Sequence, residues 1–159
     1  MSKLSTFRKD VGEKFFIREA TLLDLAALHT LNTNELGYDY PIEKAKNQLL
    51  QLLEDQRHHL LAVAENPQHK VLGYLHAEVY QEIYADPALN ILALAVNQSA
   101  QEQGIGTALI GWLEAAGKSR KIRIIRLNSG ANRQNAHAFY RHLGFEEVKT
   151  QKKFVLVSD

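Results

Sequence analysis

The sequence contains no cysteine among its 159 residues. This absence excludes disulfide bonds, zinc sites built on thiolates and a cysteine nucleophile. It also fits a reducing compartment, where disulfides are rare. The seven histidines form no His-x-x-x-His pair and no carboxylate pairing of the kind that zinc sites use. We therefore expect neither a disulfide-stabilised fold nor a metal centre.

The sequence also lacks an excess of charge and any long apolar run. Its formal net charge is +1, whereas nucleic-acid binding usually requires a strong basic stripe. The longest apolar run, residues 91–96, is far too short to span a bilayer. Residues 1–14 are polar and lack the apolar segment of a secretory signal. The sequence therefore predicts a soluble, cytoplasmic protein without nucleic-acid or membrane partners.

The hydrophobic pattern predicts a single α/β domain. Residues 1–13 show no period and are expected to be a flexible N-terminal extension, so the domain would span residues 14–159. Helices are expected at residues 22–29, 42–53, 104–118 and 136–143, with Gly144 ending the last. Strands are expected at residues 15–18, 59–64, 71–80, 89–96, 122–127 and 154–157, the last pairing with 145–149. This order predicts a mixed central sheet of about six to seven strands flanked by about four helices.

A turn with glycines follows the most apolar strand. Residues 94–107 read Leu-Ala-Val-Asn-Gln-Ser-Ala-Gln-Glu-Gln-Gly-Ile-Gly-Thr. Glycine lets the backbone approach a ligand closely, and free N–H groups at a helix start favour an anion such as pyrophosphate. The same glycines equally fit a helix that simply packs close to its sheet. The turn by itself leaves both interpretations open.

Two common phosphate-binding motifs do not fit this turn. A P-loop needs Gly-Lys-Ser/Thr, but Gly106 is followed by Thr107 without a lysine. A Rossmann fingerprint needs a third glycine where Leu109 stands, and an acidic residue at the end of the next strand. That strand ends at Leu127 and is followed by Asn128, so the acid is missing.

Two blocks of the sequence resemble the GNAT superfamily of N-acetyltransferases. Residues 94–106 contain Leu-Ala-Val and then Gln-x-x-Gly-x-Gly, which is similar to the family's Gln/Arg-x-x-Gly-x-Gly/Ala signature. Residues 133–145, with Phe139-Tyr140 and Leu-Gly-Phe, look like its C-terminal helix. Both blocks stand in the family's order, and the resemblance covers residues 14–157. It implies the acetyltransferase fold and acetyl-CoA as cofactor.

The resemblance also implies where the cofactor lies. Its pyrophosphate would sit on the amides of residues 101–107, and its pantetheine arm would pair with residues 94–96 like an extra strand. Asn132 and Asn135 are candidates to hydrogen-bond the pantetheine amides, although Asn132 equally fits a helix cap. The family's usual asparagine position holds Arg133 here. The implied cofactor-binding residues are Leu94, Ala95, Val96, Gln101, Glu102, Gln103, Gly104, Ile105, Gly106, Thr107, Asn132, Asn135 and Tyr140.

Acetyl transfer to an amine has three chemical requirements. The ammonium, with a pKa of about 10.4, must lose a proton. The developing oxyanion must be stabilised, and the resemblance implies the backbone N–H of Val96 for this task. The leaving thiolate needs a proton donor, for which Tyr140 stands at the family's position. The alternative for Tyr140 is a place in the apolar face of its helix beside Phe139.

No acid stands where many relatives carry the general base. Those positions hold Leu92, Ala93 and Asn128. Glu78 and Glu82 remain as candidates that could act through a water, and we take Glu78 as the first choice. The alternative for both is a solvated acid on an exposed strand face. An amine of low pKa or a chain of waters would also remove the need for a strong base.

The acceptor cleft is implied to lie at the loop between the first two helices. Glu35, Tyr38, Asp39 and Tyr40 could bind a cationic amine by charge and ring face, or could merely close the helix hairpin. The sequence thus predicts an acetyl-CoA-dependent N-acetyltransferase acting on a primary amine, small molecule or peptide, by direct attack in a ternary complex. The alternative is an acyl-CoA-binding sensor or partner module with little turnover. Dimerisation is common among relatives, so a homodimer is left open.

Overall fold

The computed structural model describes residues 7–9 and 14–159 of the chain. By its contacts the chain divides into two compact units, Met1–Leu127 and Asn128–Asp159, and each is described by itself. No helix among the described residues has the length and apolar character needed to cross a membrane.

The first unit is built on one mixed sheet, as the sequence predicts. The strands lie in chain order, and all neighbours are antiparallel except the parallel last pair. They are β1 (Phe7–Lys9), β2 (Phe15–Glu19), β3 (His59–Glu65), β4 (Val71–Glu82), β5 (Ala85–Val96) and β6 (Ile124–Leu127). Strand β1 falls inside the expected N-terminal extension, so part of that segment joins the sheet. The rest of the expected extension, residues 1–6 and 10–13, lies outside the described residues.

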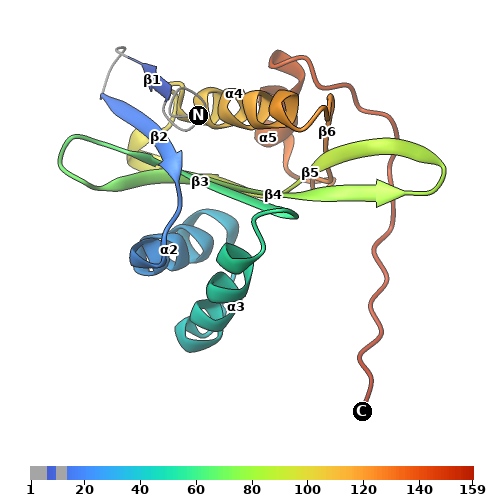
Figure 1. Cartoon of the computed structure of the whole chain (residues 1–159), viewed down its shortest axis with the longest axis horizontal. Coiled ribbons are helices and arrows are strands. Elements are labelled where there is room, and N and C mark those ends of the chain that lie inside the picture. The colour runs from blue at the N-terminus through green and yellow to red at the C-terminus, as the bar shows by residue number, and fades with distance from the viewer. Residues whose placement is uncertain (1–6, 10–13) are drawn as a thin grey trace. The chain divides into compact units, whose positions relative to one another are not determined.

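Helices cover both faces of this sheet (Figure 1). Helix α4 lies on one face, and α2 and α3 lie on the other. The 3₁₀ turn η1 leads directly into α2, and the 3₁₀ turn η2 follows β5. The bounds are η1 (Leu22–Asp24), α2 (Leu25–Leu36), α3 (Ile42–Glu54), η2 (Gln98–Ala100) and α4 (Ile105–Ser119).

The apolar side of α4 anchors the helix to the sheet. Ile105, Leu109 and Leu113 are between 0% and 1% exposed, at the spacing that places side chains on one face of a helix. Burying side chains of this size stabilises the fold by about 1.5–3 kcal/mol each. Because Ile105 is the first residue of the helix, this packing also fixes where the helix begins.

A buried ion network holds the entrance to α2. The guanidinium of Arg18 donates to both carboxylate oxygens of Asp24 at 2.8 and 2.9 Å, and to Glu65 at 2.9 Å. Asp24 also accepts the N–H of Thr21 at 2.8 Å. Burial opposes ionisation of Asp24, but these hydrogen bonds outweigh it and lower the pKa of Asp24 below its ordinary value. The network therefore joins β2, β3 and the first turn before α2.

The second unit contains one helix, α5 (Gln134–His142), and no strand. Gly144 follows the helix in the left-handed conformation, at φ 98°, as its predicted role in ending that helix requires. The predicted strand at residues 154–157 and its pairing with 145–149 are wrong: the side chains of Phe154, Val155, Leu156 and Val157 are 73% to 91% exposed. Their composition favours a strand, but a strand needs a neighbour for its N–H and C=O groups, and none lies within this unit.

Candidate active site

Strand β5 has one open edge. It pairs with β4 as far as Val96, but with β6 only from Ala88 to Ile91. Leu92 is an extra residue in the ladder with β4, because His76 faces Ala93 while the next residue of β4 faces Ile91. Such a bulge bends a strand and increases its twist. Within the described part of the first unit, no strand pairs with residues 92–96 on the β6 side.

The backbone groups of Leu94 and Val96 face this open edge. The N–H of Asn97 donates to the carbonyl of Leu72 at 2.7 Å, which marks a hydrogen-bonded pair of the antiparallel ladder. Because such pairs alternate, Val96 and Leu94 turn their N–H and C=O groups away from β4. In agreement, the carbonyl of Val96 accepts the side-chain N–H of Gln101 at 3.2 Å. Ala95 instead faces Tyr74 within the ladder.

The loop after β5 leads into the start of α4, whose first N–H groups have no partner within the helix. Glu102 and Gly104 both adopt left-handed backbone conformations, at φ 67° and 83°, and Gly104 precedes the first residue of the helix. Consecutive N–H groups in such turns, and the first N–H groups of a helix, bind anions. The side-chain Oε1 of Gln103 is buried without a hydrogen-bond partner in the described part of the chain, so a ligand N–H could satisfy it. These features fit a ligand with phosphates and amides, as coenzyme A has.

Gly73 lets the open strand and the helix start approach each other. It faces Val96 across the ladder. A Cβ at this position would lie 2.8 Å from the carbonyl oxygen of Ala95 and 3.2 Å from Cγ2 of Ile105. Only glycine therefore allows β5 and the first residue of α4 to take these positions together over β4.

A hydrogen bond ties the end of α2 to the predicted cofactor loop. The carboxylate of Glu35 accepts the backbone N–H of Gln98 at 3.1 Å. Gln98 opens η2, which connects β5 to the glycine turn. The structure thus brings one predicted acceptor residue next to the predicted cofactor loop.

The other predicted acceptor residues form an exposed turn between α2 and α3. The N–H of Tyr38 donates to the carbonyl of Asn32 at 3.0 Å, and the carbonyl of Tyr40 accepts from Nε2 of His29 at 2.7 Å. With the backbone anchored, the side chains of Tyr38 and Tyr40 are 60% and 43% exposed, and Asp39 is also exposed. They are available to an acceptor, and their role as its binding residues stays a prediction.

Glu78 belongs to a polar row that crosses four strands. His59, Glu78, Asn90 and Arg126 are successive cross-strand partners on β3, β4, β5 and β6. The amide Nδ2 of Asn90 donates to Glu78 at 2.8 Å, and Arg126 donates to Oδ1 of Asn90 at 3.0 Å. Glu78 is the predicted base, whereas Asn90 and Arg126 belong to no motif that predicts a site. The one sequence feature that could have pointed to this row is Asn90, a polar residue between Leu89 and Ile91 in an otherwise apolar strand.

This row lies on the sheet face that α2 and α3 cover. Tyr74 and Ala95 pack in the apolar cluster with those helices. Alternate residues of a strand share a face, so His76 and Glu78 follow Tyr74 on the same side. The candidate base and the candidate acceptor loop therefore share one face of the sheet.

Two histidines meet beside Glu78. Nδ1 of His59 lies 3.0 Å from Nε2 of His76, so one ring donates a hydrogen bond to the other. Burial, reinforced by the neighbouring His59, lowers the pKa of His76 to about 4. His76 is therefore neutral at physiological pH. The sequence shows no motif that links these residues, which are 17 positions apart.

In the second unit, Tyr140 lies within an aromatic cluster on α5. Its ring makes edge contacts with Phe139 and Phe145, at centroid distances of 5.6 and 5.7 Å. Burial raises the pKa of Tyr140, with a smaller opposing effect from Arg133, so the phenol keeps its proton. Both the acid role and the packing role fit these contacts, and the acid role stays a prediction.

Asn132 lies before α5 and Asn135 lies in its first turn. Arg133 is the residue that precedes the first turn of the helix, so the structure does not support Asn132 as the cap. Asn132 and Asn135 have exposed side chains, and their contact with pantetheine stays a prediction. Among the described residues, no group of three or more His, Asp or Glu side chains could hold a metal ion.

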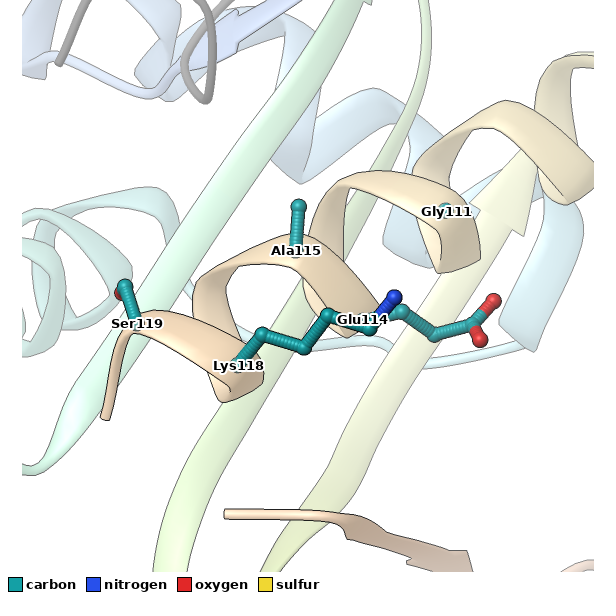
Figure 2. Close-up of a pocket in the computed structure, with 5 residues that line it drawn as sticks. All are labelled: Gly111, Glu114, Ala115, Lys118 and Ser119. Carbon is teal, nitrogen blue, oxygen red and sulfur yellow. The ribbon is translucent and has the colours of Figure 1, made fainter. Parts of the chain in front are cut away.

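A shallow groove runs along the outer side of α4 (Figure 2). Gly111 and Ala115 leave space there, and the side chains of Glu114 and Lys118 lie along the helix beside them. Ser119 completes the lining at the end of the helix. The charged side chains of the groove are Glu114 and Lys118. This pair does not point to a catalytic function, and we assign the groove no role in the chemistry.

Residues 25–145 match the sequence model of the acetyltransferase (GNAT) family. This match spans well over half of the chain, so the chain belongs to the GNAT family, as the two sequence blocks imply. No curated protein matches the chain.

Solved structures share the fold. A transcriptional regulator from Bacillus halodurans C-125 is 24% identical, with a TM-score of 0.77 over 88% of this chain and 98% of that one. The aminoglycoside 6'-N-acetyltransferase AAC(6')-Ih from Acinetobacter baumannii is 19% identical, with a TM-score of 0.78 over 91% and 99%. The aminoglycoside N-acetyltransferase AAC(6')-Iy in complex with CoA is 17% identical, with a TM-score of 0.80 over 91% and 96%. The predicted α/β fold is thereby confirmed.

Proposed function

We propose that this chain is an acetyl-CoA-dependent N-acetyltransferase that acetylates a primary amine on a small molecule or peptide. One observation carries the proposal: the backbone edge of β5 is open over residues 92–96, directly before a glycine turn that starts α4. Membership of the GNAT family supports acetyl transfer. The complex of AAC(6')-Iy with CoA supports the cofactor.

The chain's own groups would hold the cofactor from two sides. Leu94 offers its N–H and C=O, and Val96 its C=O, to the pantetheine amides, as one strand offers them to another. The N–H groups of residues 101–107 would face the pyrophosphate, at the positive end of the α4 dipole. When bound, acetyl-CoA supplies an acetyl group activated as a thioester.

Three groups of this chain would then assist the transfer. The N–H of Val96 donates to the acetyl oxygen as negative charge develops there. Glu78 accepts the proton of the ammonium through a water. Tyr140 donates its phenolic proton to the departing thiolate. Direct attack of the amine on the thioester would need no acyl-enzyme, and the chain has no cysteine that could form one.

The acceptor would bind where α2 approaches the cofactor loop. Glu35, Asp39 and Glu78 provide negative charge, and the exposed rings of Tyr38 and Tyr40 provide faces for a cation. The aminoglycoside acetyltransferases among the structural neighbours support a small amine as acceptor.

The first test is ligand-induced stabilisation. Acetyl-CoA at about one hundred times its Kd should stabilise the folded chain by about 2.7 kcal/mol, whereas NADH and ATP should not. Release of free thiol is then followed with a panel of amines. Stabilisation without thiol release would favour the acyl-CoA-binding module, and absence of stabilisation would refute both functions.

A backbone variant tests the role of Val96. Val96→Pro removes the N–H that faces the open edge, while the ladder with β4 does not use that group. Loss of one such donor should lower kcat about 10²- to 10³-fold. Val96→Ala keeps the N–H and is the matched control, expected near wild-type kcat. Equal rates for both variants would remove Val96 from the mechanism.

A further inference from the structure

Glu78 and Arg126 carry opposite charges on one sheet face without neutralising each other. The ion pairs among the described residues involve neither side chain. Both side chains are half-buried rather than fully exposed. A carboxylate and a guanidinium in such positions still seek charged partners.

Asn90 keeps the two charges apart. The Nδ2–H of Asn90 donates to the carboxylate of Glu78 at 2.8 Å, and Oδ1 of Asn90 accepts from Arg126 at 3.0 Å. Asn90 is only 7% exposed. A neutral amide orients both groups but balances neither charge. Since Glu78 and Arg126 lie two strands apart, their backbones are separated by about 9–10 Å.

Arg126 is held so that most of its donors remain available. Its guanidinium carbon lies 4.3 Å from the ring centre of Tyr80, and the hydroxyl of Tyr80 donates to Glu82 at 3.2 Å. Only one guanidinium N–H has a hydrogen-bond partner within the described residues. Arginine presents five N–H donors in a planar fork that matches a carboxylate.

The row borders the open edge of β5. The pair Asn90–Arg126 is followed by one further pair, Ile91–Leu127, before β5 and β6 separate. The bulge residue Leu92 comes next. The open edge of β5 therefore begins two residues beyond the row, about 7 Å along the strand, and an acceptor at the row would lie beside the start of that edge.

From this arrangement we propose that the acceptor is an amine that also carries a carboxylate, such as an amino acid or a peptide with a free carboxyl group. Its ammonium lies toward Glu78, and its carboxylate is bound by the free donors of Arg126. Arg126 repels a second ammonium at that place, so a diamine is a poorer acceptor. This inference rests on the proposed acetyltransferase function and specifies its substrate class.

The test compares three matched series of increasing chain length: ω-amino acids, plain alkylamines and α,ω-diamines. Thiol release gives kcat/KM for each compound with the wild-type chain. A hydrogen bond to a charged group strengthens binding about tenfold or more, so the kcat/KM of the best ω-amino acid should exceed that of its matched alkylamine and diamine about tenfold or more.

Variants of Arg126 test whether the charge of this side chain causes the preference for ω-amino acids. Arg126→Gln keeps a donor for Asn90 but removes the charge, and should abolish the preference mainly through KM. Arg126→Lys should retain part of it. Arg123→Gln, an exposed arginine three residues earlier in the chain, is the control and should leave the preference unchanged. The ratio of two substrates measured on one variant does not depend on how much of that variant is folded.

The outcomes separate this inference from the function on which it rests. Equal or better turnover of diamines, or an equal loss for all amines in Arg126→Gln, would overturn the carboxylate assignment while leaving the acetyltransferase function intact. Absence of thiol release with every series, despite stabilisation by acetyl-CoA, would overturn the acetyltransferase function and the substrate class with it.

Discussion

Gly73→Ala is the substitution that most directly tests how the fold builds the cofactor site. The added Cβ would lie 2.8 Å from the carbonyl oxygen of Ala95, 3.2 Å from Cγ2 of Ile105 and 3.3 Å from Cα of Val96. Two of these neighbours are backbone atoms, so β5 must move rather than a flexible side chain. Overpacking of this kind costs about 1–3 kcal/mol. For a chain of this size, each kcal/mol lowers Tm by about 2–4 °C.

The same displacement should weaken cofactor binding, because Val96 and the start of α4 both contact Gly73. We expect the affinity for acetyl-CoA to fall about tenfold or more, which removes about 1.4 kcal/mol of ligand-induced stabilisation. Thermal unfolding with and without acetyl-CoA measures both effects in one experiment.

Gly37→Ala is the matched control for this experiment. Gly37 has a φ of 75° and nothing within 4 Å of an added Cβ, so the variant should lose about 1–2 kcal/mol from backbone strain alone. Its stabilisation by acetyl-CoA should equal that of the wild type. If Gly73→Ala shows the same stabilisation as Gly37→Ala, the reasoning about the open edge is refuted.

Three further predictions concern single side chains. Tyr140→Phe should lower kcat at least about tenfold with little change in acetyl-CoA affinity, because only the phenolic proton is lost; unchanged turnover would remove the acid role. Burial lowers the pKa of His76 in the folded chain to about 4. As pH falls, His76 is therefore protonated in the unfolded chain before it is protonated in the folded chain. Wild-type stability should therefore decrease as pH falls from about 6.5 toward about 4. The free energy of unfolding, measured with urea at several pH values in this range, should depend less steeply on pH for His76→Gln than for the wild type. An equal dependence on pH would exclude His76 as the cause of the decrease. Leu156→Lys should change stability by less than about 0.5 kcal/mol, because its side chain is 91% exposed; a loss above about 1 kcal/mol would indicate that the C-terminal segment is paired after all.

Much of the fold follows from local patterns in the chain. The spacing of Ile105, Leu109 and Leu113 predicts α4, and the apolar run at residues 91–96 predicts a central strand, because each reflects contacts that repeat along one element. Gly144 ends α5 as predicted, since a left-handed residue after a helix is a local backbone requirement. The C-terminal segment shows the limit of such patterns: residues 154–157 have the composition of a strand but have no neighbour within their unit.

The two sequence blocks identify the family from the sequence alone, because each block is contiguous in the chain. The place of the cofactor loop that they imply stays a prediction. The residues of the proposed acceptor side are brought together only by the tertiary structure. Glu78, Asn90 and Arg126 belong to three strands, and cross-strand register brings them into one row. Register depends on the bulge at Leu92 and on how each strand meets its neighbour, and no local motif encodes that. For the same reason, the pairing of His59 with His76 and the contact of Glu35 with Gln98 appear only in the folded chain.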